Sequence, residues 1–424
     1  MTQALRWQSI VRMPAEDGPL LEMSMKVRAD SLHRGAWRRT GWLVLCCAAL
    51  LLGGCAINPP RPASAPAQLF NDSLFAAPSE RIDAEAALAL SAEMRSYLVR
   101  EIVPLARKIG PQDALIEALY TRGMLRLDYD AARTRSASEA FADRAGNCLS
   151  LVMMTAAFAR AMDLPVRFQS VRSDEAWDRS GDLYFFIGHV NLQVGTRLAL
   201  TRAGLAGTEW LTIDFLPGVD LKRQRVQQIE EARVLAMFSN NRAAEALVAG
   251  RLNDAYAWAR AAIVQDPGFM NSYNTLGVVY NRQGAVLEAE RALRFALVHE
   301  PANVHVLGNL ALVLRQQGRD AEAEPLLAEL RRLQPNPPFA LFNQGLQAAQ
   351  RGDWHSARRL FEDELARAPD YHEFHFWLAR ALLALGDVKG AGKHLKQAAE
   401  NSSTLEQGAI YSGKLDKLRP LLTQ

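Results

Sequence analysis

Apolar residues recur at different spacings along this chain of 424 residues. Between residues 79 and 105 they return every three or four positions, which predicts amphipathic helices. Residues 149–162 are mostly apolar and end before Pro165, which predicts a buried helix. Strand-like runs rich in β-branched and aromatic residues follow at 166–171, 183–194 and 209–215. The pattern predicts an α+β domain over residues 81–218.

The second half of the chain repeats itself every 34 residues. Three residue types keep this interval: Gly250, Gly284, Gly318, Gly352 and Gly386; Ala255, Ala289, Ala323, Ala357 and Ala391; Pro267, Pro301, Pro335 and Pro369. Glycine permits a turn between two helices, alanine lets the helices approach, and proline ends the second helix. The pattern resembles the tetratricopeptide repeat. It implies an all-α solenoid of five repeats at 236–403, preceded by a connector helix at 219–235 and followed by a capping helix at 404–424.

The N-terminus has the pattern of an export signal. Basic residues precede an apolar run at 42–52, and Leu52-Gly53-Gly54-Cys55 closes it. This closing sequence resembles the bacterial lipobox. The resemblance implies a signal peptide at 1–54, with Met25 as a plausible start, and Cys55 as the lipid-modified first residue of a periplasm-facing lipoprotein. A transmembrane anchor is the alternative, but about a dozen apolar residues are too few to span a bilayer.

Two further inferences follow from that signal. Ala56 follows the lipidated cysteine, and under the sorting rule of enteric bacterial lipoproteins the lack of Asp there indicates the outer membrane. Residues 55–80 are rich in proline and alanine, which predicts an extended tether.

Charge excludes one class of partner. Residues 1–54 contain seven Lys/Arg and four Asp/Glu, a surplus of three that equals the formal charge of +3 of the whole chain. The mature chain is therefore formally neutral, and nothing indicates nucleic-acid binding.

Cys148 is the only cysteine after Cys55. An exported protein is in an oxidising environment, where an unpaired thiol without a function is a liability, so the presence of Cys148 indicates a role for its thiol. Asn147 is a good N-cap, so Cys148 would open a helix whose N-terminal N–H groups favour a thiolate and can donate to an oxyanion. His189 and Asp214 follow on strand-like runs, and adjacent antiparallel strands would bring them within reach. The order Cys, His, Asp fits acyl-transfer chemistry. The alternatives are a small buried cysteine, a structural histidine and a turn aspartate.

Residues 134–171 also resemble the core of the transglutaminase-like superfamily, with Ser138-Glu139-Ala140-Phe141 before the Gly-Asn-Cys turn and a Phe-Ala-Arg-Ala-Met-Asp-Leu-Pro-Val run after it. The resemblance covers roughly residues 81–218 and implies a papain-like fold. By it, Cys148 is the nucleophile, His189 the general base and Asp214 the residue that orients the base. The implied activity is that of a thiol-dependent acyl transferase, cysteine peptidase or amidase.

Two departures from the superfamily pattern keep another function open. The histidine is followed by Val190-Asn191 in place of an Ala-Trp-type pair, and the aspartate by Phe215-Leu216 in place of Pro-Thr. The competing hypothesis is a non-catalytic envelope scaffold whose repeats mediate protein–protein interaction.

The sixth position of each repeat usually faces the concave groove in this repeat family. Here it holds Asn241, Thr275, Asn309, Asn343 and Trp377. A row of side-chain amides can pair with a peptide backbone, so Asn241, Asn309 and Asn343 are predicted to bind a peptide or protein. The alternative is that they face water.

No cofactor motif is present. His372 and His375 lie one helical turn apart, but no third ligand is placed beside them, so no metal site is predicted.

Overall fold

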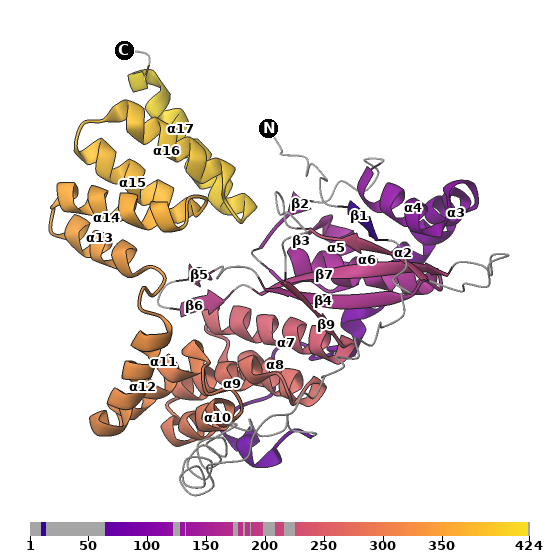
Figure 1. Ribbon diagram of the computed structural model, residues 1–424, viewed down its shortest axis with the longest axis horizontal. Helices are drawn as coiled ribbons and strands as arrows, with labels where there is room; N and C mark the ends of the chain where they lie inside the picture. The colour runs from indigo at the N-terminus through magenta and orange to yellow at the C-terminus, as the bar shows by residue number, and fades with distance from the viewer. Residues whose placement is uncertain are drawn as a thin grey trace, which may run out of the picture.

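The computed structural model describes residues 10–13, 64–121, 128–131, 133–172, 177–180, 183–186, 188–197, 208–215 and 225–422. An α+β domain is followed by a long array of helices (Figure 1). The main sheet is antiparallel, in the order β1 (Ile10–Met13), β8 (Thr208–Ile213), β7 (His189–Arg197), β4 (Val166–Arg172) and β9 (Arg225–Ile229).

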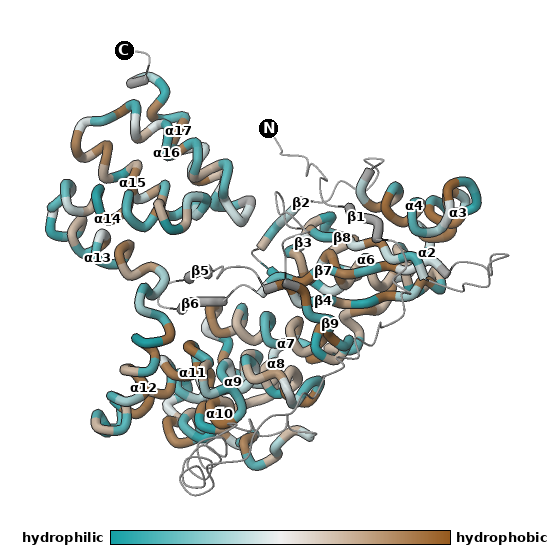
Figure 2. Tube along the Cα trace, viewed as in Figure 1, coloured by the Kyte–Doolittle hydropathy of each residue, from teal (hydrophilic) through white to brown (hydrophobic). Residues whose placement is uncertain are grey.

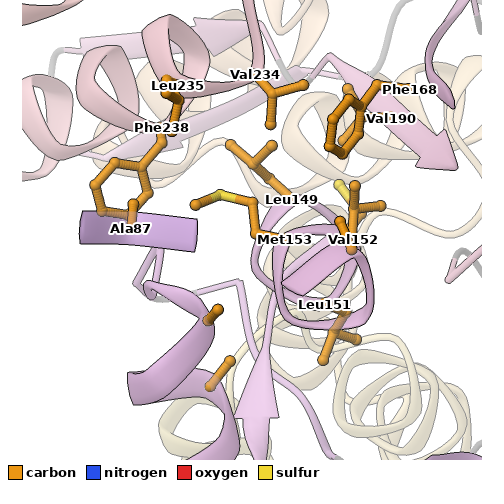
Figure 3. Packing of buried hydrophobic residues seen from close by; sticks show 14 of the residues in the cluster. Ala87, Leu149, Leu151, Val152, Met153, Phe168, Val190, Val234, Leu235 and Phe238 are labelled. Atoms are coloured by element: carbon orange, nitrogen blue, oxygen red, sulfur yellow. The ribbon is translucent and has the colours of Figure 1, made fainter. Parts of the chain in front are cut away.

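Helix α6 (Cys148–Ala161) is the central helix of the domain and packs on β7. Every residue from Cys148 to Ala159 is buried. Figure 3 shows Leu149 and Met153 of α6 between Phe168 and Val190 of the sheet on one side and residues of the first array helix on the other. Burial of a large apolar side chain stabilises by about 1.5–3 kcal/mol, so this contact holds helix, sheet and array together.

Shorter elements surround α6. The helices before it are η3 (Glu85–Leu88), α2 (Ala92–Tyr97), η4 (Leu98–Ile102), α3 (Val103–Ile109), α4 (Pro111–Ile116), η5 (Glu117–Thr121) and α5 (Ala137–Asp143). Two small pairings are β2 (Asp128–Tyr129) with β3 (Ala145–Gly146), and β5 (Trp177–Ser180) with β6 (Leu183–Phe186). Ser136 and Glu139 form a capping box at the start of α5.

The array consists of paired helices: α7 (Glu231–Val248), α8 (Leu252–Gln265), α9 (Met270–Gln283), α10 (Val286–His299), α11 (Val304–Gln316), α12 (Asp320–Leu333), α13 (Ala340–Gln350), α14 (Trp354–Arg367), α15 (His372–Ala384), α16 (Val388–Glu400) and α17 (Leu405–Leu422). Glycines between paired helices have φ between 71° and 83°, where other residues are strained. Hydrophilic and hydrophobic residues alternate along these helices (Figure 2), as expected where one face is buried.

The array is divided between its third and fourth repeats. One hydrophobic core runs from the α+β domain through the first three repeats to Ala323, and a second begins at Phe339 and extends to Leu418. The connection between α12 and α13 contains Pro335, Pro337 and Pro338, which cannot continue a helix.

Two sequence-based boundaries need correction. Residues 225–229, expected within a connector helix at 219–235, form β9, because the open edge of β4 offers backbone partners that the local sequence does not reveal. The single run expected at 183–194 is two strands, β6 and β7.

Strand β1 comes from the segment interpreted as a signal peptide. It pairs antiparallel with β8 and forms one edge of the main sheet. Residues 42–63, which include the apolar run and Cys55, lie outside the described residues. Within the described part of the chain, no helix is both long enough and apolar enough to cross a membrane.

Residues 67–80, expected within a free tether, pack along the first repeats. The segment contains η1 (Ala67–Leu69) and η2 (Asp72–Leu74). Phe75 stacks on Tyr256 with ring centroids 4.0 Å apart, and Ser79 hydrogen-bonds with Asp254 through both its N–H and its hydroxyl at 2.6 Å. Because its aromatic and polar groups find partners on the array, this part of the predicted tether is not a free linker.

Candidate thiol site and repeat groove

Cys148 is the first residue of α6. Asn147 caps the helix as predicted, its Oδ1 accepting from the Ser150 N–H at 2.9 Å. Gly146 fits tightly against this turn, because a Cβ there would lie 2.8 Å from the Ser150 Cβ. The Cys148 side chain belongs to the hydrophobic core, and the residue is 6% exposed.

His189 and Asp214 are in contact, as the strand pattern predicts. Antiparallel pairing of Leu192 with Ile213 brings His189 on β7 beside Asp214, which follows β8. His189 Nε2 lies 2.8 and 2.9 Å from the two carboxylate oxygens. Both residues are 4% exposed, so the pair is shielded from water.

Asn191 is a member of this site that the sequence argument did not single out. Its Nδ2 donates to Asp214 Oδ2 at 3.0 Å, and the residue is 1% exposed. The sequence could have indicated Asn191, because side chains alternate along a strand and Asn191 therefore lies on the same face of β7 as His189. The second donor holds the carboxylate in place and keeps it directed at the imidazole.

The surroundings of His189 favour its charged form. Burial lowers the pKa of His189, but hydrogen bonds with Asp214 and Cys148 outweigh it and raise that pKa to about 9. Since Asp214 occupies Nε2, Nδ1 is the ring nitrogen left for the Cys148 thiol. The three predicted residues are therefore brought together: His189 contacts Asp214 directly, and the Cys148 side chain is close enough to raise the pKa of His189.

The repeats form a groove on their inner face. A cavity of about 590 Å³ extends over α7, α9, α11 and α13. Four of the five sixth-position residues line it: Asn241, Thr275, Asn309 and Asn343. The cavity mixes these polar groups with apolar side chains such as Leu247 and Leu312, the composition typical of ligand sites.

Some groove amides already have partners. Asn309 Nδ2 donates to Asn274 Oδ1 at 2.9 Å, and Asn241 Nδ2 donates to Thr134 Oγ1 at 3.2 Å. The fifth sixth-position residue, Trp377, lies outside the cavity, with the Arg380 guanidinium carbon 4.2 Å from its ring centroid. The groove therefore ends at the fourth repeat.

The histidines of the fifth repeat pair with other groups. His375 Nδ1 lies 2.9 Å from His394 Nδ1, and His372 Nδ1 lies 2.9 Å from the Tyr411 hydroxyl. Among the described residues, no group of three or more His, Cys, Asp or Glu side chains is placed to hold a metal ion.

The family Tetratricopeptide repeat matches residues 274–338 and 342–406. No curated protein matches the chain.

The chain is similar to several solved structures. TTC0263, a thermophilic tetratricopeptide repeat protein of Thermus thermophilus, is 19% identical, with 42% of this chain and 98% of that chain covered and a TM-score of 0.28. PilF of Pseudomonas aeruginosa is 23% identical, with 45% and 93% covered and a TM-score of 0.26. YrrB, described as a tetratricopeptide repeat protein with an unusual peptide-binding site, is 20% identical, with 42% and 92% covered and a TM-score of 0.23.

The family match, the 34-residue period and the paired helices with glycine turns agree. The C-terminal region of this chain is an array of tetratricopeptide repeats.

Proposed function

We propose that this chain is a protein-binding protein whose repeat groove takes an extended peptide segment of a partner. The observation that carries the proposal is the polar row in one cavity: Asn241, Thr275, Asn309 and Asn343 come from four successive repeats and line the same space. Successive repeats present equivalent positions at regular intervals, so an extended chain can meet one after another.

The chemistry of the row suits a peptide backbone. Each asparagine amide offers two N–H donors and a carbonyl acceptor, so Asn309 retains hydrogen-bonding capacity beside its one bond to Asn274. Apolar neighbours such as Leu247, Leu312 and Val313 can cover the side chains of the bound segment. Pairing with the backbone makes binding tolerant of sequence.

Binding to a set of short fluorescein-labelled peptides of unrelated sequence tests this proposal. Replacing Asn309 and Asn343 together with Ala removes two hydrogen-bonding positions, so affinity should fall about tenfold for every peptide that binds. Asn401→Ala, which changes an asparagine beyond α16 and away from the groove, is the matched control and should bind as the unaltered protein does. Equal affinity of the double variant would exclude the groove as the binding surface.

The His189–Asp214 contact favours a second function, thiol-dependent acyl transfer at Cys148. An imidazolium beside the sulfur stabilises a thiolate. The sulfur would attack a peptide or amide carbonyl, forming a C–S bond and breaking the C–N bond, while His189 gives its proton to the leaving amine. Water or a second amine would then attack the thioester, return a proton to His189 and release the acyl group. The resemblance to transglutaminase-like proteins supports the same roles.

Burial of Cys148 supports the competing hypothesis of a structural thiol. At 6% exposure the sulfur is not open to a large substrate, so acyl transfer would require the covering chain to move. For this reason peptide binding stands first.

Alkylation with iodoacetamide across pH separates the two hypotheses for the thiol. An activated thiolate reacts well below pH 8, whereas a buried thiol of the core barely reacts while the protein is folded. Cys148→Ser gives the background from the other cysteines. Reaction at Cys148 only after unfolding would rule out the acyl-transfer function.

We also propose that Cys55 is lipidated and that the mature chain is held at the periplasmic side of the outer membrane. Metabolic labelling with an alkyne fatty acid should mark the protein, and Cys55→Ala should lose the label. An unlabelled protein that still contains residues 1–54 would contradict lipidation and favour the sheet arrangement in which β1 is retained.

A further inference from the structure

Thr134 is buried, and its N–H, its carbonyl and its hydroxyl all form hydrogen bonds. Its N–H donates to Glu245 Oε1 at 2.6 Å, and its carbonyl accepts from Arg242 Nη1 at 3.5 Å. Its hydroxyl oxygen accepts from Asn241 Nδ2 at 3.2 Å and from Asn147 Nδ2 at 2.9 Å. Asn241, Arg242 and Glu245 all lie on α7. The first repeat therefore binds the α+β domain at Thr134, through three residues of one helix.

Glu245 completes this junction. Burial raises the pKa of Glu245, and hydrogen bonds with the backbone N–H and hydroxyl of Thr134 oppose that rise. Arg242 lies 3.9 Å from Glu245 and pairs with Glu80 at 2.7 Å. A carboxylate withdrawn from water needs such donors, so the junction depends on the Thr134 hydroxyl as well as on its backbone.

On its other side Thr134 sets the orientation of Asn147. With Asn147 Nδ2 directed at Thr134, its Oδ1 faces Ser150 and accepts from both the N–H and the hydroxyl of that residue at 2.9 Å. Those bonds cap α6, and Cys148 is the next residue along the chain. Thr134 thus connects a groove residue, Asn241, to the turn that carries the thiol.

The far end of the array reaches the same segment. The Ala131 N–H donates to the Ser403 carbonyl at 3.0 Å, and Ser403 follows the last predicted repeat helix. The first and last repeats are therefore both attached within residues 131–134.

We infer that Thr134 is a positioning residue through which the repeat groove controls the turn carrying Cys148. The inference rests on the proposed function, since it makes an extended peptide in the groove the effector of the thiol site. A peptide backbone that draws the Asn241 side chain toward the groove moves its Nδ2 away from the Thr134 hydroxyl. Release of that bond weakens the hold on Asn147, and with it the cap of α6.

Two variants test the inference from opposite sides of the junction. Thr134→Val removes the hydroxyl and keeps the backbone groups, while Asn241→Ala removes only the groove-side donor. Each should speed hydrogen exchange at the Ser150 amide about fivefold, the effect of losing roughly one hydrogen bond. Alkylation of Cys148 by iodoacetamide near neutral pH should slow by a similar factor, and its dependence on pH should move to higher pH.

Two control variants separate the effect of the Thr134 hydroxyl from the effect of substitution in general. Thr134→Ser keeps it and should restore both rates, and Asn336→Ala, which changes an exposed asparagine between α12 and α13, should leave both unaltered. Unchanged Ser150 exchange in Thr134→Val and Asn241→Ala, with both variants folded, would overturn the inference. If Cys148 of the unaltered protein fails to react, acyl transfer is excluded, and the exchange rates alone decide whether Thr134 couples groove and turn.

Discussion

His189 Nε2 lies 2.8 and 2.9 Å from the two carboxylate oxygens of Asp214, although 25 positions separate the residues in the chain. The contact exists because β7 and β8 pair antiparallel, so that the start of β7 at His189 lies beside the end of β8, which Asp214 follows. It fixes the imidazole through Nε2 and leaves Nδ1 as its second ring nitrogen.

This contact predicts a pH-dependent stability. The pKa of His189 is raised from 6.5 to about 9, so the folded state binds the proton more tightly than the unfolded state. The stabilisation is complete below pH 6.5, about 3 kcal/mol at most, and disappears as pH rises through 9. The free energy of unfolding of His189→Asn should therefore differ most from that of the unaltered protein at acidic pH.

Urea denaturation between pH 6 and 10 measures that difference. His355→Asn, at an exposed position on α14, is the control and should change the free energy of unfolding by less than about 0.5 kcal/mol. A His189→Asn difference that stayed constant over this range would mean that the pKa of His189 is the same in the folded and unfolded states, and would contradict the raised pKa.

Gly146→Ala should distort the turn that carries Cys148. The added Cβ would lie 2.8 Å from the Ser150 Cβ, an atom fixed by the helix, so the first turn of α6 must shift. We expect a loss of about 1–3 kcal/mol in the free energy of unfolding. Gly413→Ala is the matched control, since a Cβ there meets nothing within 4 Å on α17, and it should be neutral or slightly stabilising. Equal melting temperatures for both variants would show that the turn has room.

Glu290→Gln should weaken the contact between the second and third repeats. Burial raises the pKa of Glu290, but hydrogen bonds from Gln317, Arg294 and Arg319 outweigh it and lower that pKa to about 2. A depressed carboxyl pKa stabilises the fold above pH 4.5, and the stabilisation is lost as pH falls toward 2. At neutral pH we expect a loss of about 2 kcal/mol.

Thermal unfolding of Glu290→Gln at pH 7 and pH 3 checks this. The difference in melting temperature between Glu290→Gln and the unaltered protein should be smaller at pH 3 than at pH 7. Glu329→Gln, which breaks an exposed pair with Arg332, should behave as the unaltered protein does at both. A larger difference in melting temperature at pH 3 than at pH 7 would contradict the lowered pKa of Glu290.

Features set by short stretches of sequence could be predicted. The 34-residue period predicts the array, because each repeat packs mainly on its neighbours. The caps by Asn147 and Ser136 depend on two or three adjacent residues. The approach of His189 and Asp214 needed only two adjacent strands.

Features that join distant segments could not be predicted. Asn241 and Thr134 are 107 positions apart, so the sequence places Asn241 in the groove without revealing that its amide is already bonded. Strand β9 forms where the open edge of β4 offers backbone hydrogen-bond partners. Residues 67–80 lie on the array because Phe75 stacks on Tyr256 and Ser79 hydrogen-bonds with Asp254. Each depends on a surface that exists only after folding.

Hydrogen exchange with and without a saturating groove-binding peptide tests most directly whether the array recognises an extended segment. Bound peptide should slow exchange in α7, α9, α11 and α13, which line the cavity, and leave α8 and α14, which contribute no lining residue, unaltered. At a peptide concentration near the Kd of the unaltered protein, Asn309→Ala with Asn343→Ala should lose most of the protection, because its affinity is about tenfold lower. Protection confined to α8 and α14, or protection that is undiminished in the double variant at that concentration, would contradict recognition by the groove.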